Sequence, residues 1–468
     1  MSLLSPFASA CLAIGLALST PAALAQDKPL ADTAADAPSA AQPSIPEPSS
    51  SARALFSRSK DGIVQVRVLL ASAGEQSSLG SGFLVRDDGA QGAWVVTNYH
   101  VVSALAIDPQ KYRIELRGSN QRVARARLVA LDVVHDLAVL RTEPEASNTP
   151  TAWQVLTLRE APLVQGSKVF SLGNPLELGF LISEGIYNGS VESRIYEQML
   201  FSGALNSGMS GGPAIDDNGQ VVGVNVATRR DGEQLSFLVP KRYALELLQT
   251  AWRSGGGARP EWRSEIARQL LTHQRFVAGK LLDPTASAAP SGAGAQAGFS
   301  SQVLSGRPVP TLDGNLTKCW ASGMDGERLR YQRDRLNCDL QSELFVRGGL
   351  RTGSLSIGHT LLRNDRLATP QFLALGALGS PGWRGVGQGT GELTRAECQD
   401  DYVQTASHVY RVAICARAYR KFEGVYDYSV QATQVDDARE RLSSHIDLRG
   451  FSFDNAQRLG RMFLERLQ

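Results

Sequence analysis

The chain has 468 residues, enough for two or three domains, and 43% of them are hydrophobic, so packed cores can form. Its 48 basic residues nearly balance its 46 acidic residues, and the formal net charge is +2. This balance gives no reason to expect a nucleic acid or an acidic surface as a partner.

An uncharged stretch lies at the N-terminus, from Leu3 to Ala25, and ends in the small residues that a signal peptidase reads. We therefore expect a signal peptide in residues 1–25, cleaved after Ala25, and a periplasmic or secreted location. No Lys or Arg precedes the stretch, which is against a signal peptide, and the alternative is an uncleaved membrane anchor, since residues 3–25 are long enough to span a bilayer. Residues 26–52 are rich in Ala, Pro and Ser and predict a disordered linker.

Short apolar runs separated by turn residues follow and predict strands. The runs are 63–68, 81–86, 94–98, 112–116, 123–130, 137–141, 168–172, 186–192 and 221–226. Many short strands with regular turns favour an all-β pair of barrels. Helical spacing then predicts a helix that begins at Pro240 and packs on the second barrel, and a second helix over 261–282. The apolar face expected for the second helix consists of Trp262, Ile266, Leu270 and Phe276.

A serine in a run of glycines, Ser210 in 206–213, is the main candidate for chemistry. Glycine allows a sharp turn, and such a turn can direct consecutive backbone N–H groups at an oxyanion. Serine needs a base to become a nucleophile, and His100 and Asp136 lie upstream. Each of these residues alone is more often structural, as a turn, a packed histidine or a cap. In the order His, Asp, Ser they predict a catalytic triad.

Five motifs together resemble the chymotrypsin-like serine peptidases, and within them the bacterial Deg/HtrA type. The motifs are Gly80-Ser81-Gly82-Phe83, Thr97-Asn98-Tyr99-His100-Val101-Val102, Asp136-Leu137-Ala138-Val139-Leu140, Leu172-Gly173-Asn174-Pro175 and Gly208-Met209-Ser210-Gly211-Gly212-Pro213. The resemblance implies a protease domain over residues 53–252, with two six-stranded barrels and the triad in the cleft between them. It also implies that Ser210 is the nucleophile, His100 the general base and Asp136 its orienting partner. The backbone N–H groups of Gly208 and Ser210 would form the oxyanion hole.

Two positions differ from the residues that are usual in the family that the sequence resembles. Met209 stands where Deg-type proteases usually have Asn and digestive enzymes have Asp, so we expect no zymogen cleavage. The sequence leaves open whether Met209 holds the oxyanion loop only loosely. Ala204 stands where tryptic enzymes have an acid. Val224-Asn225-Val226 resembles the strand that binds the substrate backbone and walls the S1 pocket. These residues predict cleavage after small or medium apolar residues.

The last part of the chain does not resemble this family. We expect a helical segment over 253–282, an Ala/Gly/Ser/Pro linker over 283–298 and a separate α+β domain over 299–468. In that domain, 336–346 and 353–362 predict a β pair, 425–432 a strand and 455–467 a helix. A glycine-rich run at 385–391 predicts a mobile loop, since it lacks the strand and helix of a nucleotide site. Deg-type proteases usually carry a PDZ domain after the protease domain, and none is recognisable here.

Four cysteines of the C-terminal domain predict two disulfides, since an even number in a secreted chain favours pairing. Of the three possible pairings we favour sequence neighbours, Cys319–Cys338 and Cys398–Cys415. No spacing indicates a metal site, and the motifs require no cofactor. The sequence thus predicts a serine endopeptidase with polypeptide substrates, and the resemblance implies that these are unfolded or damaged envelope proteins. The alternative is a chaperone-like or binding protein on a protease fold, with a gated or inactive oxyanion loop.

Overall fold

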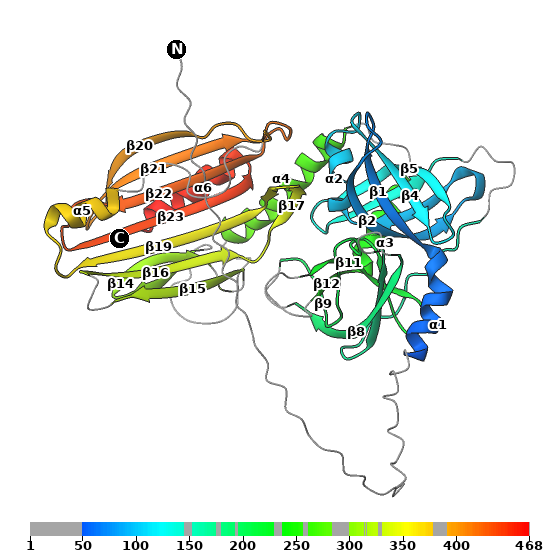
Figure 1. The fold of residues 1–468 in the computed structure, drawn as a ribbon. Coiled ribbons are helices and arrows are strands. Elements are labelled where there is room, and N and C mark those ends of the chain that lie inside the picture. The colour runs from blue at the N-terminus through cyan, green and yellow to red at the C-terminus, as the bar shows by residue number, and fades with distance from the viewer. Residues whose placement is uncertain are drawn as a thin grey trace, which may run out of the picture. The chain divides into compact units, whose positions relative to one another are not determined.

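A computed structural model describes most of the chain after residue 48. The described ranges are 49–144, 152–174, 179–191, 195–228, 236–255, 261–282, 299–312, 314, 316–325, 330–377 and 391–467. The predicted signal, the linker over 283–298 and most of the glycine-rich run at 385–391 lie outside them. The described residues form two closed six-stranded barrels and a seven-stranded sheet (Figure 1). No helix in these ranges is long and apolar enough to span a membrane.

The first barrel has the strand order β1-β2-β3-β6-β5-β4. Its strands are β1 (Ile63–Leu70), β2 (Gln76–Asp87), β3 (Ala93–Thr97), β4 (Tyr112–Gly118), β5 (Val123–Asp132) and β6 (Leu137–Thr142). Alternation along β1 directs Val64, Val66 and Val68 into the barrel core. The apolar runs predict all six strands. Helix α2 (Tyr99–Ile107), which follows β3, is not predicted, because it is apolar on every side and shows no helical period.

The second barrel has the order β10-β11-β12-β9-β8-β7 and confirms the predicted double-barrel fold. Its strands are β7 (Lys168–Gly173), β8 (Leu181–Ser190), β9 (Met199–Phe201), β10 (Pro213–Ile215), β11 (Val221–Thr228) and β12 (Ser236–Pro240). Strands β9, β10 and β12 are not predicted. They have three to five residues each, too few for an alternating pattern to stand out.

Two helices pack on the outside of the barrels. Helix α1 (Ser50–Ser59) is capped by Ser49, whose hydroxyl accepts the backbone N–H of Ala52 at 3.3 Å, and it begins inside the range predicted as linker. Helix α3 (Lys241–Arg253) begins one residue after Pro240, which still belongs to β12. The buried side of α3 lies in one apolar cluster with residues of both barrels. The predicted packing of α3 on the second barrel is therefore confirmed, and the helix also packs on the first barrel, which the sequence does not predict.

A third helix, α4 (Trp262–Leu282), connects the barrels to the C-terminal sheet. Trp262, Ile266 and Leu270 are buried as predicted, in the same cluster as the core of the first barrel. Phe276 is 45% exposed, and Val277 takes its place on the buried side. The buried positions keep a helical spacing along all 21 residues, and Phe276, six residues after Leu270, falls off that stripe.

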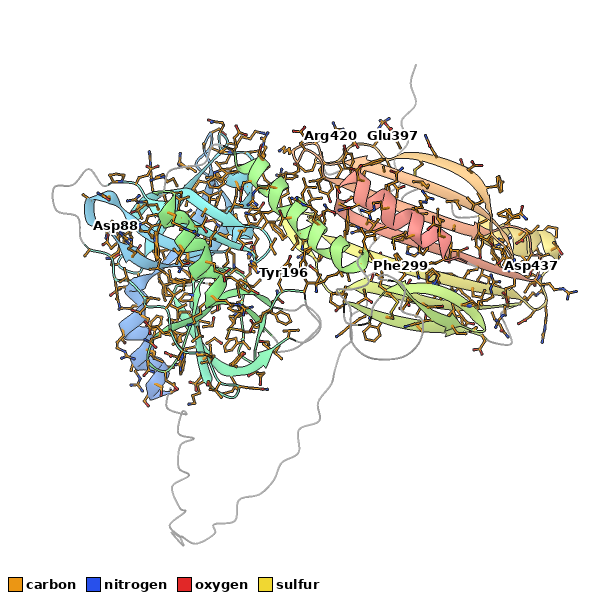
Figure 2. The ribbon with its side chains drawn as sticks, turned by 180° about the vertical axis from the view of Figure 1, so that it is seen from behind. Asp88, Tyr196, Phe299, Glu397, Arg420 and Asp437 are labelled. Carbon is orange, nitrogen blue, oxygen red and sulfur yellow. A yellow bond between two sulfur atoms is a disulfide. The ribbon has the colours of Figure 1, made fainter. Side chains whose placement is uncertain are left out.

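The C-terminal sheet is antiparallel, in the order β15-β16-β19-β23-β22-β21-β20. Its strands are β15 (Thr317–Met324), β16 (Tyr331–Leu340), β19 (Ser354–Asn364), β20 (Glu397–Gln404), β21 (Val409–Ala418), β22 (Tyr426–Gln434) and β23 (Glu440–Phe451). Smaller elements are the hairpin β13 (Phe299–Leu304)–β14 (Arg307–Leu312), the hairpin β17 (Leu344–Arg347)–β18 (Leu350–Thr352) and helix α5 (Thr369–Ala377). Helix α6 (Phe453–Glu465) covers the apolar face of the sheet (Figure 2).

The range 336–346, predicted as one strand, divides into two. Strand β16 ends at Leu340, and β17 begins at Leu344 in a separate two-stranded sheet. The apolar positions before and after the polar residues Gln341–Glu343 keep the same alternating phase and hide the break, so the prediction of one continuous strand is wrong. The predicted pairing of this segment with 353–362 is confirmed, because β16 pairs with β19. The break matters because it directs the β17–β18 hairpin out of the large sheet.

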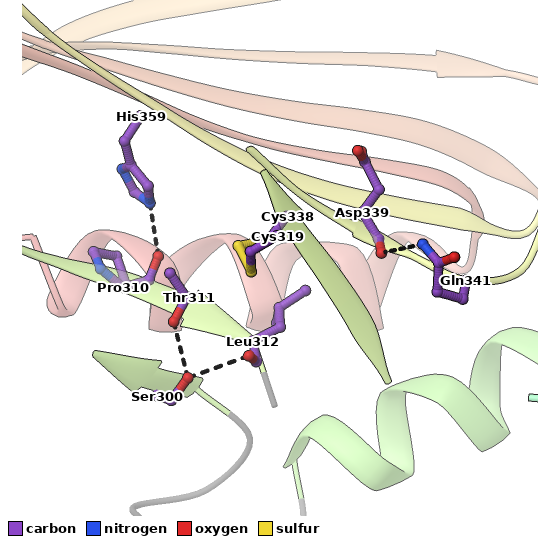
Figure 3. The surroundings of a disulfide bond; sticks show 9 residues. All are labelled: Ser300, Pro310, Thr311, Leu312, Cys319, Cys338, Asp339, Gln341 and His359. Carbon is purple, nitrogen blue, oxygen red and sulfur yellow. Dashed lines mark hydrogen bonds between the residues drawn. A yellow bond between two sulfur atoms is a disulfide. The ribbon is translucent and has the colours of Figure 1, made fainter. Parts of the chain in front are cut away.

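Both disulfides connect neighbouring strands, at the two edges of the sheet. Cys319 of β15 is bonded to Cys338 of β16, and Cys398 of β20 to Cys415 of β21, the pairing favoured from the sequence. Figure 3 shows the first of them beside the β13–β14 hairpin. Each disulfide ties an edge strand to its only strand neighbour in the sheet, where pairing is otherwise weakest.

A buried histidine connects the β13–β14 hairpin to the sheet near that disulfide (Figure 3). His359 is 1% exposed, and its Nε2–H donates to the Pro310 carbonyl at 2.7 Å. Its Nδ1 then accepts the Ser444 hydroxyl at 2.8 Å. Burial lowers the pKa of His359 to about 4, although the bond to Pro310 opposes this, so the ring is neutral in the folded chain.

Candidate active site

The histidine and the aspartate predicted for the triad meet in the first barrel. His100 is the second residue of α2, and Asp136 lies in the turn before β6. The His100 Nδ1 and an Asp136 carboxylate oxygen are 2.6 Å apart, and the His100 backbone N–H donates to the other oxygen at 2.8 Å. One carboxylate therefore fixes both the ring and the start of the helix that carries it.

The turn that presents Asp136 is itself firmly held. Asp136 has a φ of 56°, a left-handed conformation that Asp tolerates better than most residues. Its carbonyl accepts the Tyr99 backbone N–H at 3.1 Å and the Asn98 side-chain amide at 2.8 Å. The end of β3 and the start of α2 thus hold the backbone of Asp136 while its side chain holds His100.

Asp136 also sets the protonation of the histidine. Loss of water around the ring, whose side chain keeps 28% exposure, disfavours the charged form. The charge of Asp136 and its hydrogen bond outweigh this effect and raise the pKa of His100, while Arg351 acts against them. Asp136 thus favours the imidazolium that a general base becomes when it accepts a proton.

Ser210 lies in a tight turn of the second barrel, between β9 and β10. The Met209 N–H donates to the Asn206 carbonyl at 3.0 Å, and Gly208 has a φ of 94°, which together are typical of a type II turn. Gly211 has a φ of 85°, and a Cβ there would lie 2.3 Å from the Ser81 carbonyl oxygen. Among the described residues, the backbone N–H groups of Gly208 and Ser210 have no acceptor, so both remain free to bind an oxyanion.

Polar contacts from both barrels hold this turn. The Ser81 hydroxyl of β2 donates to the Gly208 carbonyl at 2.7 Å and accepts the Asn174 N–H at 2.9 Å. The Ser81 N–H donates to the Ser210 carbonyl at 2.8 Å. The side-chain amide of Asn225 donates to the Met209 carbonyl at 3.3 Å.

Met209 is an apolar anchor for the same turn. Its side chain is 1% exposed and packs in the core of the second barrel with Met199, Phe201 and five other residues. Its sulfur accepts the Asn206 N–H at 3.5 Å. The sequence leaves open a loosely held loop, and in the structure the burial of Met209 holds this position.

The Ser210 hydroxyl donates to the Val226 carbonyl of β11. In the described part of the chain, Ser210 and His100 share no hydrogen bond. The Ser210 proton must therefore leave the Val226 carbonyl before the histidine can accept it. In this state, the candidate base and its carboxylate partner are hydrogen-bonded to each other, and the candidate nucleophile is hydrogen-bonded elsewhere.

The residues predicted for the S1 pocket do not all lie near Ser210. Val226 contacts Ser210 through its carbonyl, and Ala204 is exposed on the segment before the turn. The side chains of Val224 and Asn225 are fully buried, Val224 in a core cluster and Asn225 beneath the Ser210 turn. They support the site from inside the barrel and do not wall a pocket.

His135, the neighbour of Asp136, lies in the turn before β6. Its Nδ1 is 2.6 Å from an Asp132 carboxylate oxygen, and its ring stacks on Tyr243 at 3.7 Å. Tyr196, labelled in Figure 2, packs against the ring edge at 5.1 Å. This histidine is a packed side chain that connects the first barrel to α3.

Comparisons with known proteins agree with the fold and with the resemblance predicted from the sequence. Residues 80–224, which hold most strands of the two barrels, match the family model of the trypsin-like peptidase domain. The chain is 31% identical over 205 residues to a periplasmic serine endoprotease, named DegP-like, from Marinomonas sp. (strain MWYL1), covering 42% of this chain and 40% of that protein. It is 29% identical over 239 residues to the chloroplastic protease Do-like 1 of Arabidopsis thaliana, covering 48% of this chain and 51% of that protein.

A solved structure, the serine endoprotease from Yersinia pestis, matches with 26% identity and a TM-score of 0.37, over 45% of this chain and 69% of that chain. The chain spans about half, or less, of the length of the curated relatives that it matches. The described residues of the C-terminal domain lie beyond the range of the family model.

Proposed function

We propose that the chain is a serine endopeptidase that hydrolyses peptide bonds of polypeptides through an acyl-enzyme. Ser210 Oγ attacks the scissile carbonyl carbon while His100 Nε2 takes the hydroxyl proton. The tetrahedral oxyanion accepts the N–H groups of Gly208 and Ser210. Collapse breaks the C–N bond, and His100 returns the proton to the leaving amine. Water then hydrolyses the ester by the same steps.

One observation carries this proposal: the short His100–Asp136 pair next to a serine turn that leaves two N–H groups without an acceptor. Asp136 would keep the proton of His100 on Nδ1, so that Nε2 is free to act as the base. The Val226 carbonyl, released when the Ser210 side chain rotates, would accept an N–H of an extended substrate chain.

We propose a periplasmic or secreted location and substrates that are unfolded or damaged envelope proteins. The location is supported by the names of the DegP-like relatives and by two disulfides, which persist in oxidising compartments. Cleavage of the signal after Ala25 would release the chain. We also propose the domain bounds predicted from the sequence, with the protease domain over residues 53–252.

We propose that the enzyme cleaves after small or medium apolar residues. Ala204 places no charge beside the serine turn that could pair with Lys or Arg, and Val226 has an apolar side chain. Mapping of the cleavage sites in denatured casein by mass spectrometry tests this. Cuts confined to positions after Lys and Arg would contradict it.

The second candidate is a chaperone-like protein that holds chains in the cleft without cutting them. It is favoured by the Ser210 hydroxyl, which donates to Val226 and not to His100. Incubation with denatured casein, in parallel with Ser210→Ala, decides between the two. The peptidase degrades casein and the variant does not. Equal suppression of casein aggregation by both proteins, with casein intact, would support the holding function instead.

A further inference from the structure

The β17–β18 hairpin of the C-terminal domain packs directly on α2, the helix that carries His100. The buried side of the hairpin consists of Leu344, Val346 and Leu350, which lie in one apolar cluster with the buried residues of α2 and the first barrel. The hairpin therefore packs on the protease domain through a shared apolar core.

Two aromatic contacts and one hydrogen bond join the hairpin to the start of α2. The Tyr99 hydroxyl, fully buried, donates to the Val346 carbonyl at 2.8 Å. The half-buried ring of Phe345 meets the His100 ring nearly perpendicularly, with centroids 5.8 Å apart, and the Tyr99 ring at 6.5 Å. Perpendicular packing at these distances is the favoured geometry of aromatic pairs.

The other end of α2 is held by charges from outside the barrel. Asp108, at the C-terminal end of the helix, pairs with Lys421 at 2.9 Å and with Arg263 of α4 at 2.8 Å. The guanidinium of Arg347 in the hairpin is 3.8 Å from the same carboxylate. A carboxylate at a helix C-terminus is disfavoured by the helix dipole, so these three cations offset a cost and fix the helix end.

Phe345 and Arg351 lie directly opposite each other on the two strands of the hairpin. Their side chains therefore lie on the same face of the hairpin, the face that contacts His100 through Phe345. Arg351 is 58% exposed, pairs with Glu343 at 3.2 Å and acts to lower the pKa of His100. The charged groups that act on this imidazole are therefore Asp136 from the first barrel and Arg351 from the hairpin.

We infer that the β17–β18 hairpin is part of the active site and that Phe345 is a positioning residue for His100. This inference rests on the proposed peptidase function. Asp136 binds the Nδ1 atom of the His100 ring, and the Phe345 ring packs nearly perpendicular to that ring. Together the two contacts limit rotation of the imidazole away from Ser210. The C-terminal domain would then act as a built-in activator of the protease domain in the same chain.

Variants of the full-length chain test this role with denatured casein as substrate. Phe345→Ala is expected to lower kcat/KM between about tenfold and about 100-fold, through kcat, because a misplaced catalytic group costs rate more than binding. Phe345→Leu should fall between this variant and wild type. The matched control is Trp320→Ala, which removes a 69% exposed aromatic side chain from the same domain and should retain wild-type rates. Circular dichroism and Tm confirm that each variant is folded.

The pH profile supplies a readout that a merely structural hairpin would not move. Removing the cation of Arg351 should raise the pKa of His100, so Arg351→Gln shifts the acid limb of kcat/KM to higher pH. The control Arg461→Gln removes an exposed arginine of the same domain that is also paired with a glutamate, and its acid limb should not move.

The results separate this inference from the proposed function. Slow turnover by Phe345→Ala together with a shifted acid limb for Arg351→Gln supports the role of the hairpin. An active wild-type chain with wild-type kcat/KM for Phe345→Ala overturns this inference alone. A folded wild-type chain that neither cleaves casein nor reacts with a fluorophosphonate overturns the proposed function and, with it, this role of Phe345.

Discussion

Replacing Met209 with Ala should weaken both the fold and the oxyanion turn. The side chain is 1% exposed in the core of the second barrel, and truncating a buried Met to Ala costs about 2–5 kcal/mol of unfolding free energy. The turn would also lose the contact of the Met209 sulfur with the Asn206 N–H. Since Met209 lies between the two oxyanion donors, a loosened turn that loses one of them should lower kcat by about 100-fold.

The matched control is Met199→Ala, which makes the same truncation in the same core. Met199 is 4% exposed on β9 and does not belong to the serine turn. Both variants should unfold at lower urea concentration, but only Met209→Ala should lose kcat at temperatures where both are folded. Met209→Leu, which nearly keeps the volume, should retain most activity. Equal kcat for the two alanine variants would refute the anchoring role of Met209.

Three further changes have expected outcomes. Asp136→Asn should lower kcat by about 10,000-fold with little change in stability, because the amide favours the wrong tautomer of His100; casein kinetics within tenfold of wild type would contradict this. Ser81→Ala should lower kcat/KM about tenfold, since the Gly208 carbonyl loses its hydrogen-bond donor. The control Ser103→Ala, which also removes a serine hydroxyl bonded to a backbone carbonyl, should leave kcat/KM unchanged. Because His359 is neutral when folded, the unfolded chain binds more protons below pH 6.5 and stability should fall by on the order of 3 kcal/mol as the pH drops toward about 4. Urea unfolding of wild type and His359→Gln at pH 7 and 4.5 measures this, and equal pH dependence would contradict it.

The protease fold could be predicted because its signals are local. The apolar runs predict all six strands of the first barrel, and motifs of a few residues each identify His100, Asp136 and Ser210 as candidates. These residues are far apart in the chain, and the resemblance to a known family implied that they come together.

Two features of the site could not be predicted, for different physical reasons. The anchoring of Met209 depends on side chains from several strands of the second barrel, which only the folded core brings together. The contact of Phe345 with His100 joins residues of two domains, and nothing local to 344–352 indicates where the hairpin packs. Long-range packing of this kind leaves no periodic trace in a single sequence.

Reaction of the full-length chain with a fluorophosphonate tests the central claim most directly, because that reagent modifies a serine only when a base activates it. Intact mass and peptide mapping should show a single adduct on Ser210, absent from Ser210→Ala and strongly slowed in His100→Ala. An adduct elsewhere, or a chain that stays unmodified while folded, would contradict the assignment of Ser210 and His100 as nucleophile and base.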